Sequence, residues 1–186
     1  MFDKLKKTIH YIIFLANEGK WPFGTVKLAK SVVLSDVSSL YYGKGTITGV
    51  KIVKAPHGPV PEGYARALRE LVDEGLISVD EGDLLYEPTS YKSLAAPDSS
   101  GFTEVEKEIL KEITEMCCMK YTATALSDLT HNETWKKTAM GEEIPFEVYF
   151  PDRERQGAIQ EVLPPTSEQI EESLRQITSM GYHISD

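Results

Sequence analysis

The sequence has 186 residues, of which 41% are hydrophobic and 26% are charged, as expected for a soluble globular protein that folds without disulfides. Its two cysteines, Cys117 and Cys118, are adjacent, which disfavours a disulfide and rules out a C-x-x-C metal motif. This cysteine pattern favours a reducing, cytoplasmic setting. The apolar run 11–16 is too short to span a bilayer, so we expect no membrane partner.

The net charge of −9 is unevenly distributed. Residues 1–60 contain nine lysines and no arginine against Asp3, Glu18 and Asp36, so the rest of the chain is strongly acidic. Such asymmetry has two interpretations. Either the two parts attract each other, or each part attracts a partner of opposite charge.

Two amphipathic helices are predicted first. Apolar residues at helical spacing run over 5–16, and this helix should stop near Gly19. A second helix should start with Thr25 as its N-cap and end at Gly43. Asp36 lies at the edge of its apolar stripe. A carboxylate there either faces water or, if buried, needs a hydrogen-bonding partner.

A β-rich stretch follows. Residues 45–54 indicate an extended connection or a short strand, and the proline-rich stretch 55–62 indicates a stiff turn. Pro61 suits the first turn of a third helix that ends at Gly75. The apolar face of this helix should contain Tyr64, Leu68, Leu71 and Val72. Residues 76–88 are then typical of a β-hairpin.

The remaining elements are again mostly helical. A polar loop is predicted over 88–102, and Thr103 with Glu106 forms a capping box that opens a helix. A short helix over 123–129 and a strand-like alternation over 144–150 follow. Another capping box, at Thr166, opens a last amphipathic helix. We therefore predict a mainly α fold: a compact helical domain with a small β-hairpin over 1–150, and a C-terminal extension over 151–186 ending in a helix.

The chain offers no local catalytic or metal motif. Its four histidines, His10, His57, His131 and His183, stand at no H-x-x-x-H or H-x-E spacing. The sequence has no G-x-S-x-G elbow, and Gly43-Lys44-Gly45-Thr46 lacks the upstream glycine of a phosphate loop. We therefore expect neither an enzyme nor a bound metal or cofactor.

Residues 62–88 also resemble the helix and hairpin that end a winged-helix DNA-binding module. The candidate wing, however, carries Asp80, Glu81 and Asp83, which phosphates would repel, and no arginine precedes Arg66. We expect no nucleic-acid partner. A winged-helix-like transcriptional regulator is kept as an alternative.

Three motifs resemble those of the Panacea domain, also described as SocA-like or phage-associated GepA-like. The first is the helix segment 27–36, which ends in Asp36. The second is Thr46-Ile47-Thr48-Gly49 followed by His57-Gly58-Pro59-Val60-Pro61. The third is Leu126-Ser127-Asp128-Leu129-Thr130-His131 followed by Trp135. The first motif departs from the family pattern at Leu34-Ser35, where an aromatic pair is usual. The resemblance covers roughly residues 5–150.

This resemblance implies an antitoxin that neutralises a cognate protein toxin, encoded by an adjacent gene, through direct binding. A second possibility that it implies is an adaptor that delivers its partner to a protease. It implies no catalytic residue. Family-motif positions with a structural or partner-binding role would be Asp36, His57, Gly58, Pro59, Pro61, His131 and Trp135, with Asp36 as a buried anchor. The extension 151–186 lies outside the resemblance and is our first candidate for partner-specific contact.

Overall fold

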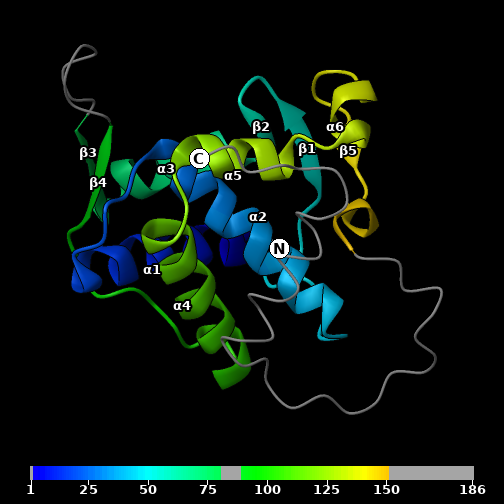
Figure 1. The fold of residues 1–186 in the computed structure, drawn as a ribbon. Helices are drawn as coiled ribbons and strands as arrows, with labels where there is room; N and C mark the ends of the chain where they lie inside the picture. The colour runs from blue at the N-terminus through cyan, green and yellow to red at the C-terminus, as the bar shows by residue number, and fades with distance from the viewer. Residues whose placement is uncertain (1, 81–88, 151–186) are drawn as a thin grey trace.

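The computed structural model describes residues 2–80 and 89–150, apart from the side chain of Phe2 (Figure 1). Its described part is mainly helical, as predicted. The longer helices are α1 (Phe2–Gly19), α2 (Thr25–Tyr41), α3 (Tyr64–Asp73), α4 (Glu104–Met119) and α5 (Ala123–Thr130). The short elements are α6 (Glu133–Lys137), a 3₁₀ turn (Phe146–Tyr149), and the strands β1 (Ile52–Ala55), β2 (Gly58–Pro61), β3 (Ile77–Asp80), β4 (Ser90–Ser93) and β5 (Glu143–Ile144).

Helix α2 is the centre of the fold. It packs against α1 and α4, and also against β2 and α5 (Figure 1). As a result, every residue from Leu28 to Val37 is buried, not only one stripe. The predicted amphipathic pattern was therefore wrong for this helix. Ser31 and Ser35 lie outside the predicted apolar stripe, and their small side chains allow neighbouring elements to pack closely there.

Of the two predicted helix caps within the described residues, the one at Thr103 is confirmed and the one at Thr25 is wrong. The capping box is confirmed, because the Thr103 side chain accepts from the Glu106 N–H and the Glu106 side chain accepts from the Thr103 N–H. Thr25, by contrast, is the first helical residue and Gly24 is the N-cap. The Thr25 hydroxyl instead lies 3.1 Å from the Tyr91 hydroxyl of β4, a long-range contact that competes with the local capping role.

The proline-rich stretch forms a strand as well as a turn. β1 and β2 pair antiparallel, with Lys54 opposite Pro59 and Ile52 opposite Pro61, and β5 pairs along the other side of β1. Pro61 therefore ends β2 rather than opening α3, whose N-cap is Gly63. Prolines are compatible with a strand here because β2 is the edge of its sheet.

Three further predictions need correction. Val72 is 41% exposed and does not belong to the buried face of α3. Residues 90–93, predicted as loop, form β4 and pair with β3. Residues 144–150 contain only the end of a two-residue strand and then a 3₁₀ turn, because Pro145 provides the N-cap of that turn. The second half of the hairpin predicted over 76–88 and the predicted C-terminal helix lie outside the described residues.

Lysines of the basic N-terminal part form ion pairs with acidic residues of the rest of the chain. Lys4 pairs with Glu106 at 2.6 Å, and Lys7 pairs with Asp98 at 2.9 Å. Lys6 contacts the carboxylates of Glu70 and Glu74 on α3. These ion pairs join the basic N-terminal part to the acidic remainder. They support the interpretation that the two parts attract each other.

Candidate functional site

Asp36 on α2 anchors the loop that leads into β1. Its side chain is 1% exposed, so of the two alternatives left open by the sequence the buried one is correct. The Thr48 N–H donates to Oδ1 at 2.8 Å, and the Thr48 hydroxyl donates to Oδ2. Burial raises the pKa of Asp36 to about 6, although the hydrogen bonds from Thr48 act in the opposite direction.

Lys30, six residues before Asp36 on α2, binds the β1–β2 hairpin. Its side chain is also 1% exposed. Nζ donates to the backbone oxygens of His57 at 3.2 Å and Pro59 at 3.3 Å. Burial lowers the pKa of this amine to about 7 from an ordinary value of 10.5.

The strand register explains why Lys30 is needed. Lys54 exchanges hydrogen bonds with the β5 side, since its N–H donates to Glu142 and its oxygen accepts from Gly141. The backbone N–H and C=O of Lys54 therefore point away from β2. In an antiparallel pair, the N–H and C=O of the residue opposite Lys54 must then point away from β1. That residue is Pro59. Proline has no N–H that could remain unpaired, and Lys30 binds the Pro59 oxygen. At this position the edge of the sheet therefore offers no free backbone group to another strand.

Gly58 lies where the hairpin, α2 and the end of α5 meet. Its φ of +111° is in the region that only glycine adopts readily. A Cβ at this position would collide with Lys30 Nζ and would lie 2.5 Å from His131 Nε2. The absence of a side chain therefore allows both nitrogens to approach the hairpin backbone.

His131 and Trp135 complete the site beside Gly58 and the hairpin. Their rings stack with centroids 3.9 Å apart and planes 7° from parallel. Lys54 Nζ lies 4.5 Å from the centre of the Trp135 ring and donates to the backbone oxygens of Lys136 and Thr138. Burial, followed by the positive charge of Lys30, lowers the pKa of His131.

The structure thus groups most of the candidate residues. His57, Gly58, Pro59, His131 and Trp135 meet around the hairpin, and Pro61 ends β2 beside them. Asp36 is separate from this group and contacts the preceding loop. His57 is exposed at the tip of the hairpin and contributes its backbone oxygen.

Sequence reasoning missed two members, Lys30 and Thr48. Lys30 sits within the first family motif, but no role was predicted for it, since lysine is rarely buried. Its signal was its position in a run of otherwise small or apolar residues. Thr48 was quoted in the second motif, but nothing local in the sequence indicates that it binds Asp36.

The polar groups of this site chiefly hold the chain's own backbone. Among residues 2–80 and 89–150, no three His, Cys, Asp or Glu side chains are grouped so that they could hold a metal ion. In the same part of the chain, no helix combines the length and apolar character needed to cross a membrane.

Comparison with protein families matches residues 28–136 to the family described as "Antitoxin SocA-like, Panacea domain". The chain belongs to this family. The match begins two residues before Lys30 and ends just after Trp135, so it contains the whole site and all seven candidate residues of this Panacea domain. No curated protein and no solved structure matches the chain.

The low pKa of Lys30 predicts a pH dependence. Between pH 7 and 10.5 the unfolded chain binds more protons than the native Panacea domain, so Lys30 makes the free energy of unfolding rise with pH over this range. Lys30→Met should remove that rise. Urea unfolding of both proteins at about pH 7 and about pH 9 measures it. Equal pH dependence in wild type and variant would show that Lys30 is not desolvated in the native state.

Proposed function

We propose that this chain is an antitoxin that neutralises a cognate protein toxin by binding it directly. Its membership of the SocA-like, Panacea-domain antitoxin family carries this proposal. The partner would be the product of an adjacent gene, as in other toxin–antitoxin pairs. No catalytic step is part of the proposal.

The geometry of the site supports binding rather than catalysis. Lys30, Asp36 and Gly58 are all buried, and the hydrogen bonds of the two charged residues go to the domain's own backbone and to Thr48. Such contacts fix the shape of a hairpin and a loop. A rigid surface of this kind reduces the entropy lost when a partner binds.

The ion pairs of the N-terminal helix weaken the DNA-binding alternative. Helix α3 with β3 and β4 does form a helix–hairpin unit, as a winged helix would. However, Lys6 on α1 contacts Glu70 and Glu74 on α3, so this lysine already has carboxylate partners. The exposed acidic residues of α3 and β3 would also repel phosphates.

Co-expression tests the proposal. The toxic product of the gene adjacent to this chain's own gene is induced alone and together with the chain, and growth is followed. Growth should be restored only when the chain is present. A toxin that remains fully toxic in the presence of well-expressed, folded chain would contradict the proposal.

The same strains separate occlusion from delivery to a protease. If the chain acts by occlusion, the half-life of the toxin should be unchanged or longer when growth is restored. A toxin that disappears faster in the presence of the chain would favour the adaptor alternative.

A further inference from the structure

The β3–β4 hairpin has two outer edges, and one of them is covered. The side chain of Asn17 on α1 lies along β4, where Nδ2 donates to the Tyr91 oxygen at 3.1 Å and Oδ1 accepts from the Ser93 N–H at 2.7 Å. An asparagine amide has the same donor and acceptor groups as a peptide unit. Asn17 therefore replaces a neighbouring strand on this side.

These bonds define the direction of the backbone groups on β3. The backbone N–H and C=O groups of Tyr91 and Ser93 point away from β3. The backbone groups of their partners, Val79 and Ile77, therefore point away from β4. Ile77 is buried, but Val79 is 38% exposed. Within the described part of the chain, neither the N–H nor the C=O of Val79 has a hydrogen-bond partner.

The edge at Val79 contrasts with the outer edges of β2 and β4. Pro59 and Lys30 close the outer edge of β2, and Asn17 covers that of β4. β3 carries no proline, and its hairpin stands at one end of the molecule (Figure 1). An unpaired strand edge is a template for the addition of another extended chain.

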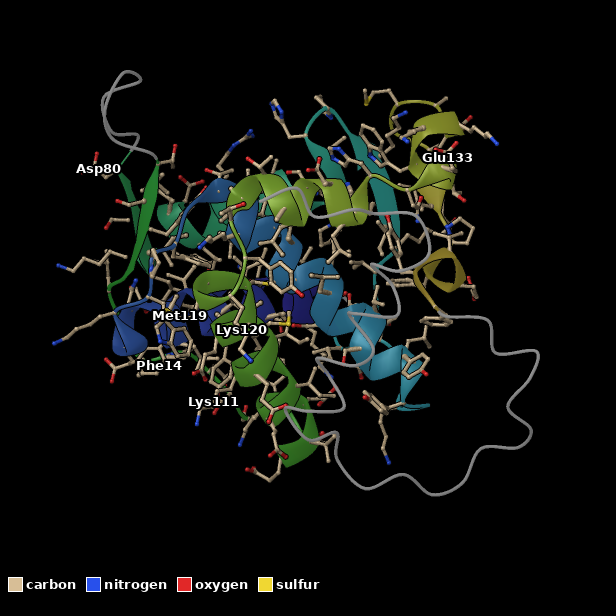
Figure 2. The ribbon with its side chains drawn as sticks, in the orientation of Figure 1. Phe14, Asp80, Lys111, Met119, Lys120 and Glu133 are labelled. Atoms are coloured by element: carbon tan, nitrogen blue, oxygen red, sulfur yellow. The ribbon has the colours of Figure 1, made fainter. Side chains whose placement is uncertain are left out.

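Charge indicates which chain would fit. The exposed acidic residues on and just before β3 include Asp73 and Asp80, and Asp80 lies at the outer end of the hairpin (Figure 2). A second copy of this chain would bring its own exposed Asp73 and Asp80 to this edge and so offers no complementary charge. An extended segment with lysine or arginine beside an apolar residue would complement both the charge and the exposed Val79 side chain.

We propose that the outer edge of β3 at Val79, unpaired within residues 2–80 and 89–150, accepts an extended, positively charged segment of the protein toxin as an added strand. This inference rests on the proposed antitoxin function and assigns a contact surface to it. The added strand would accept a hydrogen bond from the Val79 N–H and donate one to the Val79 oxygen.

Val79→Pro tests this directly. Proline removes the N–H of Val79 that points away from β4. Ser78 and Asp80 keep their hydrogen bonds, because their backbone groups point towards β4. Val79→Thr is the matched control, since it keeps the N–H and nearly the same side-chain shape. Circular dichroism and thermal melting establish that both variants fold.

The first measurement uses synthetic peptides and the full chain. A peptide of alternating lysine and valine is titrated while the amide signals of the chain are followed by NMR, with a glutamate–valine peptide for comparison. The lysine peptide should protect the Val79 amide and bind wild type and Val79→Thr alike, and Val79→Pro about fivefold to tenfold more weakly, as expected for one lost hydrogen bond. Equal binding of both peptides, or equal binding by the proline variant, would overturn the inference.

The second measurement is toxin neutralisation. Wild type and Val79→Thr should restore growth, and Val79→Pro should fail to do so although it is folded. Full rescue by the proline variant would overturn the inference and leave the antitoxin function standing. If wild type rescues no toxic product, the antitoxin function fails.

Two further outcomes are decisive. A dimer of the chain alone that Val79→Pro dissociates would show that a second copy occupies the edge, which contradicts the inference. If the proline variant does not fold, the peptide titration is repeated with Asp80→Lys in its place. Asp80→Lys should weaken binding of the lysine peptide and strengthen that of the glutamate peptide, and an unchanged preference would contradict the inference.

Discussion

Gly58→Ala is expected to lower the free energy of unfolding by about 3 kcal/mol, and the melting temperature by about 10 °C. Two costs add. The φ of +111° is unfavourable for alanine, and the new methyl group would collide with Lys30 Nζ and the His131 ring. Thermal melting and urea unfolding measure the effect.

Gly75→Ala is the matched control for this variant. Gly75 also has a positive φ, +69°, but nothing lies within 4 Å of the position that its Cβ would occupy. It should cost only about 1–2 kcal/mol, the backbone term alone. If both variants lost the same stability, close packing around Gly58 would play no part.

The collision with Lys30 can be isolated in a double-mutant cycle. Gly58→Ala combined with Lys30→Met should be less destabilised than the sum of the two single variants, by about 1 kcal/mol. The reason is that methionine has no terminal nitrogen bound to the hairpin and can move aside. Additive effects would mean that Lys30 yields to the methyl group without cost.

Asp36→Ala is expected to destabilise the protein by about 2–4 kcal/mol at neutral pH. The variant leaves the N–H and the hydroxyl of Thr48 without their acceptor, and Thr48 is 1% exposed. Asp36→Asn keeps one acceptor oxygen and should lose less, about 1 kcal/mol. Urea unfolding gives both values. An unchanged stability in Asp36→Ala would remove Asp36 as an anchor.

The raised pKa of Asp36 gives this prediction a pH signature. Between pH 3.8 and about 6 the native state binds more protons than the unfolded chain, so this residue lowers the stability as the pH rises through that range. Asp36→Asn should not show this component. The difference in unfolding free energy between wild type and Asp36→Asn should therefore shift in favour of wild type towards acid pH. A constant difference from pH 4 to pH 6 would contradict the raised pKa.

Local signals predicted the elements that depend on local chemistry. The capping box at Thr103 and the apolar stripe of α1 were correct because their partners lie within one or two helical turns. Helix α2 was predicted with correct length but with the wrong exposure. Its Ser31 and Ser35 look like a polar face, and only its central position in the fold shows that they are packed.

The strands were harder to predict because their partners are distant. β4 has the sequence Ser90-Tyr91-Lys92-Ser93, which lacks strong strand residues apart from tyrosine, and it is fixed by β3 and Asn17. β2 contains two prolines, which locally indicate a turn. Its strand geometry depends on being at an edge where Lys30 replaces a missing neighbour.

The candidate site was predicted only through family motifs. The motifs named His57, Gly58, His131 and Trp135, but they did not show that these residues meet. Asp36 needed a partner if buried, and that requirement was correct, yet Thr48 could not be chosen from the sequence. Lys30 was missed because the cost of burying an amine is offset by backbone oxygens that lie 27 and 29 residues later in the chain.

The proposal that the chain neutralises a toxin by binding is tested most directly by titration of the purified proteins. The toxic product of the adjacent gene is held at a fixed concentration, its activity is followed, and increasing amounts of the full chain are added. Toxin activity should fall linearly and end at a fixed molar ratio, and size-exclusion chromatography should show one complex with that ratio. Complete loss of toxin activity at a small fraction of that ratio, with no complex formed, would contradict neutralisation by binding.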